Sequence, residues 1–281
     1  MNYFESQRIS ESTTAITSIN DVRCFLIEGE REAILIDTGV GIGDLREYVS
    51  GLSAKPLRAV LLTHGHCDHA GGVSGFENVY LNQADMNLVG IHTARDMRMG
   101  YIRNVMKDGW QEEMVQDILP SYRGKYEDLR DGMRFSLGNV TLRTLALKGH
   151  TPGMMCVLNE EERWLLLGDA CNTFTFMFDA YASSIEEYHK TLISFKNEYG
   201  SLFDTVYLSH GPLAFEPSLI DENIELCEEI LKKEDDGVPF SFMGKDGYRI
   251  AKAVKNYQRI DGKNGNIVYN PNNIRKDRNH V

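Results

Sequence analysis

Short apolar runs separated by turn residues dominate the first part of the chain and predict β-strands. The runs Arg23–Glu28 and Glu32–Ile36 are separated by Gly29, Glu30 and Arg31, a short connection with glycine that is typical of a β-hairpin. A helix is expected over Gly43–Leu52, and a strand over Arg58–Leu62 stops at a polar cluster. Strands that alternate with helices indicate the α/β class.

The pattern changes between Asn82 and about Asp131, where apolar residues recur at near-helical spacing among charged residues. This spacing predicts a helical insertion over 82–131. After Pro217, an amphipathic helix is expected over Ser218–Lys233, with acidic residues early and lysines late, as the helix dipole favours. Further strands are expected at Asn139–Leu147, Met154–Leu158, Trp164–Leu167 and Thr205–Leu208. We therefore expect a main domain over residues 1–216 and a C-terminal helix with short strands over 217–281 that packs on the core.

The composition indicates a compartment and excludes some partners. The 281 residues are 42% hydrophobic, but the apolar runs are far shorter than the ~20 residues of a membrane-spanning helix. The first residues lack the basic start and apolar stretch of a secretory signal, and the five cysteines are odd in number and widely spaced. We expect a cytoplasmic protein with no membrane partner. A formal net charge of -11 disfavours nucleic acid as a partner.

Three imidazoles and a carboxylate fall within six positions directly after the strand that ends at Leu62. The segment contains His64, His66, Asp68 and His69. Zinc, iron and manganese accept imidazole and carboxylate ligands, and a strand end followed by a turn lets the four side chains face two adjacent metal positions. The alternative is a polar loop with solvated histidines, but such clusters seldom coincide with a strand end. We interpret the four residues as metal ligands.

Three more candidate ligands each follow an apolar strand. His150 comes after the strand that ends at Leu147, Asp169 after the strand over 164–167, and His210 after the strand over 205–208. Loops at the carboxyl ends of strands are where α/β proteins gather ligand-binding residues. A single His or Asp in such a place is more often a turn residue. We interpret these three as metal ligands because they accompany the first cluster.

His64-x-His66-x-Asp68-His69, followed by His150, Asp169 and His210 in that order, resembles the motif set of the metallo-β-lactamase superfamily. The match spans about Val22 to Pro212. The resemblance implies an α/β fold of four layers, an αββα sandwich with the helical insertion and a small C-terminal extension, and a catalytic role for residues 1–216. Asp37 matches the early aspartate with which that family supports its metal-binding loop, although a turn cap is equally compatible with an aspartate there.

The resemblance also implies how the metals are held. One ion would take His64, His66 and His150, the other would take Asp68, His69 and His210, and Asp169 would bridge the two. The cofactors are expected to be two divalent ions, zinc first, with iron and manganese as alternatives. A hydroxide that bridges them, with its pKa lowered to about 7, would be the nucleophile, and Asp68 is the candidate catalytic proton donor.

The implied function is a dinuclear metal-dependent hydrolase of an ester, lactone or thioester bond in a small molecule. Members that hydrolyse β-lactams generally lack the bridging aspartate, so Asp169 disfavours that activity. The alternative is a small-molecule phosphodiesterase that resembles phosphorylcholine esterases. An iron-dependent sulfur oxygenase and a metal-binding protein without catalysis are weaker alternatives. A homodimer is the oligomer that the resemblance suggests.

A few residues near these motifs are interpreted individually. Tyr181 is a candidate substrate contact, because the lactonase branch of the family places a substrate-facing tyrosine beyond its bridging aspartate. The neighbouring phenylalanines, Phe174, Phe176 and Phe178, are interpreted as core residues rather than as pocket walls. Cys67 and Cys171 are interpreted as packing residues rather than as sulfur ligands, because free cysteine usually behaves as a small apolar side chain.

Overall fold

The computed structural model describes residues 2–276, which form two compact units. Of the described residues, 2–146 and 157–162 form the first unit, and 147–156 and 163–276 form the second. Strand β10 (Met155–Asn159) lies where the chain passes from the second unit back to the first. Within residues 2–276, none of the helices combines the length and apolar character that a membrane-spanning helix needs.

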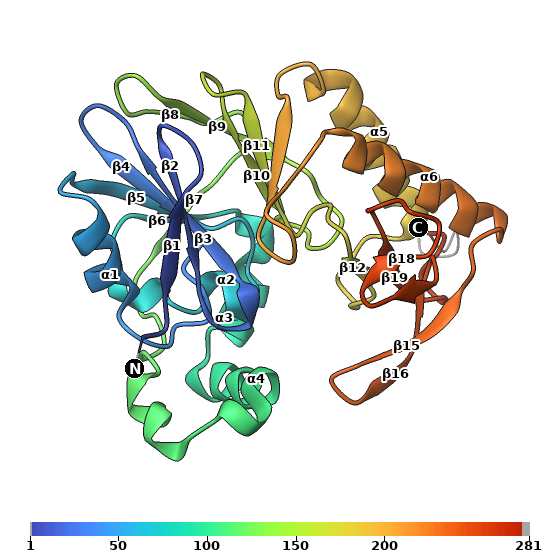
Figure 1. The fold of residues 1–281 in the computed structure, drawn as a ribbon, viewed down its shortest axis with the longest axis horizontal. Helices are drawn as coiled ribbons and strands as arrows, with labels where there is room; N and C mark the ends of the chain where they lie inside the picture. The colour runs from blue at the N-terminus through green and yellow to red at the C-terminus, as the bar shows by residue number, and fades with distance from the viewer. Residues whose placement is uncertain (1, 277–281) are drawn as a thin grey trace. The chain divides into compact units, whose positions relative to one another are not determined.

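The first unit is built on a seven-stranded sheet whose strands follow one another in chain order (Figure 1). The strands from β1 to β4 are antiparallel, and β5, β6 and β7 continue parallel to β4. Leu26 lies opposite Leu35, so the hairpin predicted from the sequence is confirmed. The strands are β1 (Glu5–Arg8), β2 (Thr13–Thr17), β3 (Arg23–Glu28), β4 (Ala33–Ile36), β5 (Leu57–Leu61), β6 (Val79–Leu81) and β7 (Tyr126–Asp128).

Strand β5 lies inside this sheet, between β4 and β6. Its residues Ala59, Val60 and Leu61 are buried, as expected for a parallel strand whose two faces are both covered. Val60 packs in the same core as Leu35 and Val79, its neighbours on the adjacent strands. The residues that follow β5 therefore start from a rigid position.

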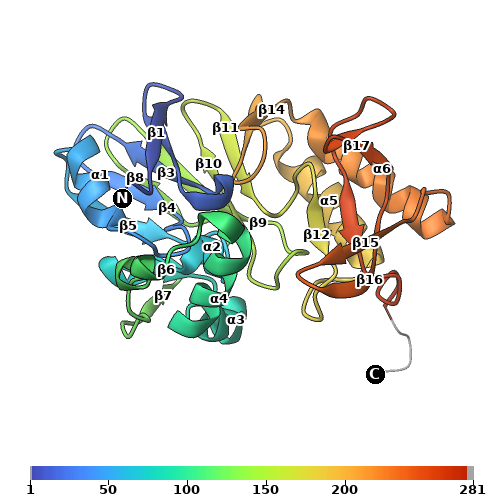
Figure 2. The ribbon, with the colours of Figure 1, turned by 60° about the horizontal axis from the view of Figure 1, so that its bottom comes forward.

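Four helices belong to the first unit: α1 (Leu45–Leu52), α2 (Cys67–Ala70), α3 (Met86–His92) and α4 (Arg95–Met106). Helices α2, α3 and α4 contact one another (Figure 2). Helices α3 and α4, together with three short 3₁₀ helices (Gln83–Asp85, Lys107–Gly109 and Glu112–Asp117), lie in the range where the sequence predicts a helical insertion. The end of that range, β7, forms a sheet strand that the sequence did not predict. The antiparallel pair β8 (Arg134–Ser136) and β9 (Thr141–Ala146) also belongs to this unit.

The described residues of the second unit contain three groups of paired strands. Strand β11 (Trp164–Gly168) runs parallel to β13 (Thr205–Leu208), which pairs with β14 (Ala214–Phe215). A four-stranded sheet has the order β12-β19-β16-β15. Its strands are β12 (Thr175–Met177), β19 (Ile267–Tyr269), β16 (Lys245–Ile250) and β15 (Val238–Phe242), and a small pair is formed by β17 (Val254–Lys255) and β18 (Gln258–Arg259).

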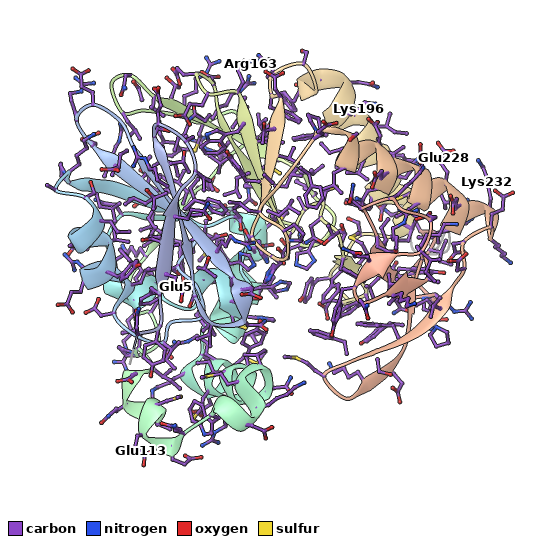
Figure 3. The ribbon with its side chains drawn as sticks, in the orientation of Figure 1. Glu5, Glu113, Arg163, Lys196, Glu228 and Lys232 are labelled. Atoms are coloured by element: carbon purple, nitrogen blue, oxygen red, sulfur yellow. The ribbon has the colours of Figure 1, made fainter. Side chains whose placement is uncertain are left out.

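Helices α5 (Ile185–Tyr199) and α6 (Ser218–Lys232) run side by side in the second unit (Figure 1). The predicted helix after Pro217 is thus confirmed, one residue shorter than expected. Lys196 of α5 and Glu228 and Lys232 of α6 lie on the outside of the pair (Figure 3), where Glu228 and Lys232 form an ion pair of 3.2 Å. The polar faces of both helices are therefore solvated.

Whether residues 1–216 act as the catalytic domain stays a prediction.

Candidate metal centre

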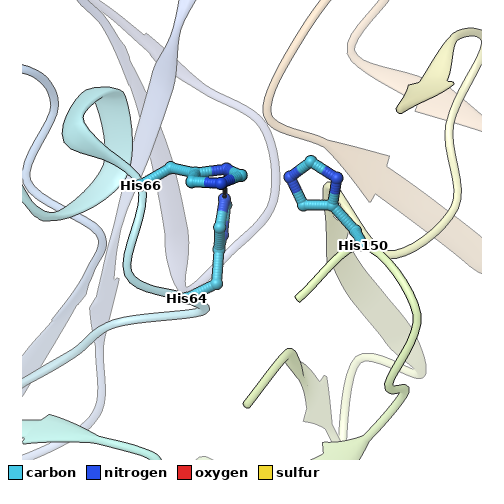
Figure 4. A group of neighbouring side chains, drawn as sticks. All are labelled: His64, His66 and His150. Carbon is cyan, nitrogen blue, oxygen red and sulfur yellow. Dashed lines mark hydrogen bonds between the residues drawn. The ribbon is translucent and has the colours of Figure 1, made fainter. Parts of the chain in front are cut away.

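The first cluster of predicted ligands follows β5 directly and is held inside the first unit. His64 and His69 are fully buried and His66 is nearly so, while Asp68 is half-buried. The Nε2 atom of His64 lies 3.0 Å from the Nδ1 atom of His66 (Figure 4). The ligand atoms of His64 and His69, and those of Asp68 and His69, lie within 4.8 Å of each other. The structure therefore brings these four side chains together.

Asp37 lies at the centre of the hydrogen bonds beneath this cluster. Its backbone has a φ of +60°, a left-handed conformation that aspartate tolerates better than most residues, and its N–H donates to the carbonyl of Leu61. Its carboxylate accepts hydrogen bonds from the backbone N–H of Thr63 at 2.8 Å and from the Thr63 hydroxyl at 2.8 Å. The Nδ1 of His69 lies 2.8 Å from Oδ2 of Asp37. The predicted supporting role of Asp37 thus has a geometric basis.

These hydrogen bonds set the tautomers of two imidazoles. A carboxylate only accepts, so the Nδ1 of His69 carries the proton and its Nε2 presents a lone pair. The Thr63 hydroxyl donates its one proton to Asp37, so it accepts from the Nδ1–H of His64 at 3.0 Å. The Nε2 of His64 therefore also presents a lone pair. Histidines that bind metals usually have their second nitrogen held in this way.

Two glycines allow the ligand loop to lie against the loop that follows Asp37. A Cβ atom on Gly72 would lie 2.2 Å from the carbonyl oxygen of Thr38, and one on Gly71 would lie 2.4 Å from that of Val40. The N–H of Gly72 donates to the carbonyl of Gly39 at 3.1 Å. Side chains at 71 and 72 would therefore push the two loops apart.

Two contacts to the ligand loop come from residues that sequence reasoning missed. The hydroxyl of Tyr101, on α4, donates a hydrogen bond of 3.0 Å to Oδ2 of Asp68. Burial, followed by the negative charge of Asp68, raises the pKa of Tyr101 well above its ordinary value, so the hydroxyl stays protonated. The buried carboxylate of Asp85 accepts from the N–H of Gly65 at 2.9 Å. Neither residue belongs to a sequence motif that could have signalled it.

The other three predicted ligands converge within the second unit. Oδ2 of Asp169 lies 3.7 Å from Nε2 of His150 and 3.4 Å from Nε2 of His210. His150 is drawn in Figure 4; its Nδ1–H donates to the carbonyl of Phe176 at 2.6 Å, so in the neutral imidazole the lone pair is on Nε2. Asp169 and His210 retain part of their exposure, at 14% and 27% of their side chains. The possible metal-binding atoms of these three residues, two nitrogens and a carboxylate oxygen, thus lie close together.

The remaining candidates lie close to this second group in the sequence. Tyr181 is half-buried and its hydroxyl donates to Oδ2 of Asp179 at 3.0 Å. Phe178 is buried, as predicted for a core residue, whereas Phe174 and Phe176 are only half-buried. They pack in an aromatic cluster with rings from β15 and β16, namely Phe240, Phe242 and Tyr248.

The cysteines are all buried and reduced. Burial raises the pKa of the Cys67 and Cys171 thiols, which disfavours the thiolate that a metal would need. Among residues 2–276, the side-chain groups that could hold a metal ion draw on all seven predicted ligands and contain histidine and aspartate but no cysteine. The chemistry of this donor set fits a borderline divalent ion such as zinc.

Comparison with known proteins identifies several relatives. A family model described as the metallo-beta-lactamase superfamily matches residues 19–199. The acyl-coenzyme A thioesterase MBLAC2 of Homo sapiens is 28% identical over 168 residues, which cover 53% of this chain and 58% of that protein. The atrochrysone carboxyl ACP thioesterase of Aspergillus fumigatus is 27% identical over 224 residues, which cover 78% of this chain and 44% of that protein. The chain thus spans about half the length of the curated relatives it matches.

Solved structures show a similar fold at low sequence identity. A metallo-beta-lactamase from Pontibacter korlensis has a TM-score of 0.58 at 18% identity, covering 80% of this chain and 99% of that one. The sec-alkylsulfatase Pisa1 from Pseudomonas sp. has a TM-score of 0.63 at 13% identity, covering 82% of this chain and 42% of that one. At these identities the likeness concerns the fold alone.

Proposed function

Because the chain belongs to the metallo-β-lactamase superfamily, we propose that it is a metal-dependent hydrolase that cleaves the thioester bond of a small acyl thioester. The membership confirms the resemblance drawn from the histidine and aspartate motifs, and the solved neighbours confirm the predicted α/β fold class. The reaction and the metals are the parts proposed.

The convergence of donors on Asp169 is the observation that carries the proposal. Nε2 of His150 lies 3.7 Å, and Nε2 of His210 lies 3.4 Å, from the same carboxylate oxygen of Asp169. Lone pairs and a carboxylate repel one another unless a proton or a cation lies between them. A divalent cation would bind the two Nε2 atoms and the carboxylate at once and remove this repulsion.

The first cluster supports the same interpretation by its tautomers. Asp37 and Thr63 engage the Nδ1 atoms of His69 and His64, which leaves the Nε2 atoms of both rings to bind a metal ion. A hydrogen bond to the second ring nitrogen is typical of histidines that bind a metal ion. We propose that one ion takes His64, His66 and His150, that the other takes Asp68, His69 and His210, and that Asp169 bridges them.

The proposed chemistry divides between the ions and the chain. Two divalent ions, proposed to be zinc, supply Lewis acidity when bound. Hydrolysis adds water at the thioester carbonyl carbon and breaks the C–S bond, so the products are a carboxylic acid and a thiol. The leaving sulfur needs a proton, which comes from the added water, and Asp68 is the residue proposed to accept that proton and pass it to the sulfur.

The relatives named as thioesterases support a thioester over the ester, lactone and phosphodiester alternatives. Acyl-coenzyme A substrates are therefore the first to test, with a thiol-reactive dye to detect the released thiol. We expect hydrolysis by zinc-loaded protein, loss of activity after chelation and recovery on adding zinc. A higher kcat/KM for bis-nitrophenyl phosphate than for any thioester would favour the phosphodiesterase alternative, and hydrolysis that persists without metal would refute the proposal.

A further inference from the structure

Tyr101 contacts Asp68 from a helix that lies outside every metal-binding motif. Its hydroxyl donates to Oδ2 of Asp68 at 3.0 Å and accepts from the Nδ2 amide of Asn20 at 3.1 Å. Asn20 lies on the 3₁₀ helix Ile19–Asp21, which contacts α4. The phenol is thus oriented on one side by Asn20 and orients a carboxylate on the other.

Helix α4 is fixed independently of this contact by Arg98, one turn before Tyr101. Arg98 is fully buried, and its guanidinium donates to backbone carbonyls from three separate segments of the chain. The acceptors are the carbonyls of Thr93, Val40, Gly41 and Leu119. Residues three apart share one face of a helix, so the buried arginine and the tyrosine point from α4 into the same part of the unit.

We propose that Tyr101 is a positioning residue that holds the Asp68 carboxylate in the orientation needed to bind a metal ion. The inference rests on the proposed function, because it treats Asp68 as a metal ligand. A hydrogen bond to one carboxylate oxygen fixes the rotation of the group about its Cβ–Cγ bond, so less freedom is lost when an ion binds. Through Arg98 and Tyr101, helix α4 then supports the ligand loop, which gives the helical insertion a role in metal binding.

The decisive test is the zinc affinity of Tyr101→Phe, which removes the hydroxyl and keeps the ring. Zinc binding is measured by competition with a chromophoric chelator, with no substrate present. Loss of a group that orients a metal ligand typically lowers metal affinity roughly tenfold to hundredfold. We expect this loss for one of the two equivalents of zinc, together with a fall in kcat at an unchanged KM.

Tyr122→Phe is the matched control, because the Tyr122 hydroxyl belongs to the same insertion but donates to the carbonyl of Lys125. It should bind zinc as the unchanged protein does. A second variant, Asn20→Gly, removes the other partner of the phenol and suits the φ of +61° at that position. We expect it to weaken zinc binding in the same direction as Tyr101→Phe, but by less.

The possible outcomes separate this inference from the proposed function. Equal zinc affinities for Tyr101→Phe, Tyr122→Phe and the unchanged protein would overturn the inference, whatever the substrate is. Weaker zinc binding by Tyr101→Phe but not by Tyr122→Phe would support it, even if no thioester is hydrolysed and the proposed function fails. Thermal melting of the metal-free variants checks that each one is folded.

Discussion

The Nδ1–H of His69 donates a hydrogen bond of 2.8 Å to Oδ2 of Asp37, and both side chains are fully buried. The same carboxylate accepts from Thr63, whose hydroxyl in turn accepts from His64. One aspartate therefore determines which nitrogen of two candidate ligands carries the proton.

Replacing Asp37 with asparagine should disturb both imidazoles. Asparagine tolerates the φ of +60°, but its amide group has only one oxygen to accept from Thr63 and His69. We expect zinc affinity to fall roughly tenfold to hundredfold, as measured by chelator competition. Asp44→Asn, which changes a helix cap and keeps its acceptor oxygen, is the control. Equal affinities for the two variants would show that the tautomers do not depend on Asp37.

Asp169→Ala should lower metal content and turnover together. The change leaves Nε2 of His150 and Nε2 of His210 without the carboxylate that lies 3.7 Å and 3.4 Å away. We expect elemental analysis of protein prepared without chelators to find fewer than two metal ions for each chain. Normal two-metal occupancy in this variant would remove the assignment of Asp169 as the bridge.

Tyr181→Phe tests the candidate substrate contact. The change removes the hydroxyl that donates to Asp179 and leaves the ring in place. A typical hydrogen bond contributes about 1 kcal/mol, so we expect KM or kcat on a hydrolysed thioester to change about fivefold. If steady-state kinetics give both constants unchanged, Tyr181 does not contact the substrate.

Arg98→Met should destabilise the fold strongly. Burial lowers the pKa of Arg98 to about 10, so the side chain is still a cation at neutral pH, and its loss removes a charged donor from the carbonyls of Val40, Gly41 and Leu119. We expect the free energy of unfolding in urea to fall by about 3 to 5 kcal/mol. Arg103→Met, at an exposed ion pair with Glu112, should cost about 1 kcal/mol or less. Similar losses for both variants would contradict the anchoring role of Arg98.

Tyr3 should make stability depend on pH in the alkaline range. Burial, then the hydrogen bond to Asp117 and the charge of that residue, raise the pKa of Tyr3 from 10.0 to about 12. The folded state thus favours the protonated phenol, so this contribution to stability is complete below about pH 10 and is lost as the pH rises to about 12. Tyr3→Phe should reduce the fall in unfolding free energy over that interval, and Tyr257→Phe, at an exposed position, should leave it unchanged. An identical fall in both variants would exclude a role for Tyr3.

The sequence was most informative where one local pattern decides the structure. Strand β3 has the predicted bounds Arg23–Glu28, β5 is shifted by one residue from its prediction, and α6 ends one residue earlier than predicted. Helix α5 was missed, although Ser184 and Glu187 form a capping box and Ile185, Tyr188 and Leu192 have helical spacing. The sequence therefore contains a local signal for this helix.

Contacts between distant segments could not be predicted in the same way. The motif spacing identified the family and grouped His64, His66, Asp68 and His69, because these residues are adjacent in the chain. The hydrogen bond from Tyr101 to Asp68 joins residues 33 positions apart and depends on where α4 packs. A tyrosine among the methionines and arginines of an insertion carries no local pattern that indicates such a contact.

The close approach of Gly71 and Gly72 to the carbonyls of residues 38 and 40 limits how this protein can change. Exchanges among the side chains at positions 64 to 69 could alter which cation is preferred without moving the backbone. A bulkier residue at 71 or 72 would require a matching change in the loop after Asp37. Natural or laboratory evolution of a new metal preference should therefore keep both glycines and vary the histidines and aspartate around them.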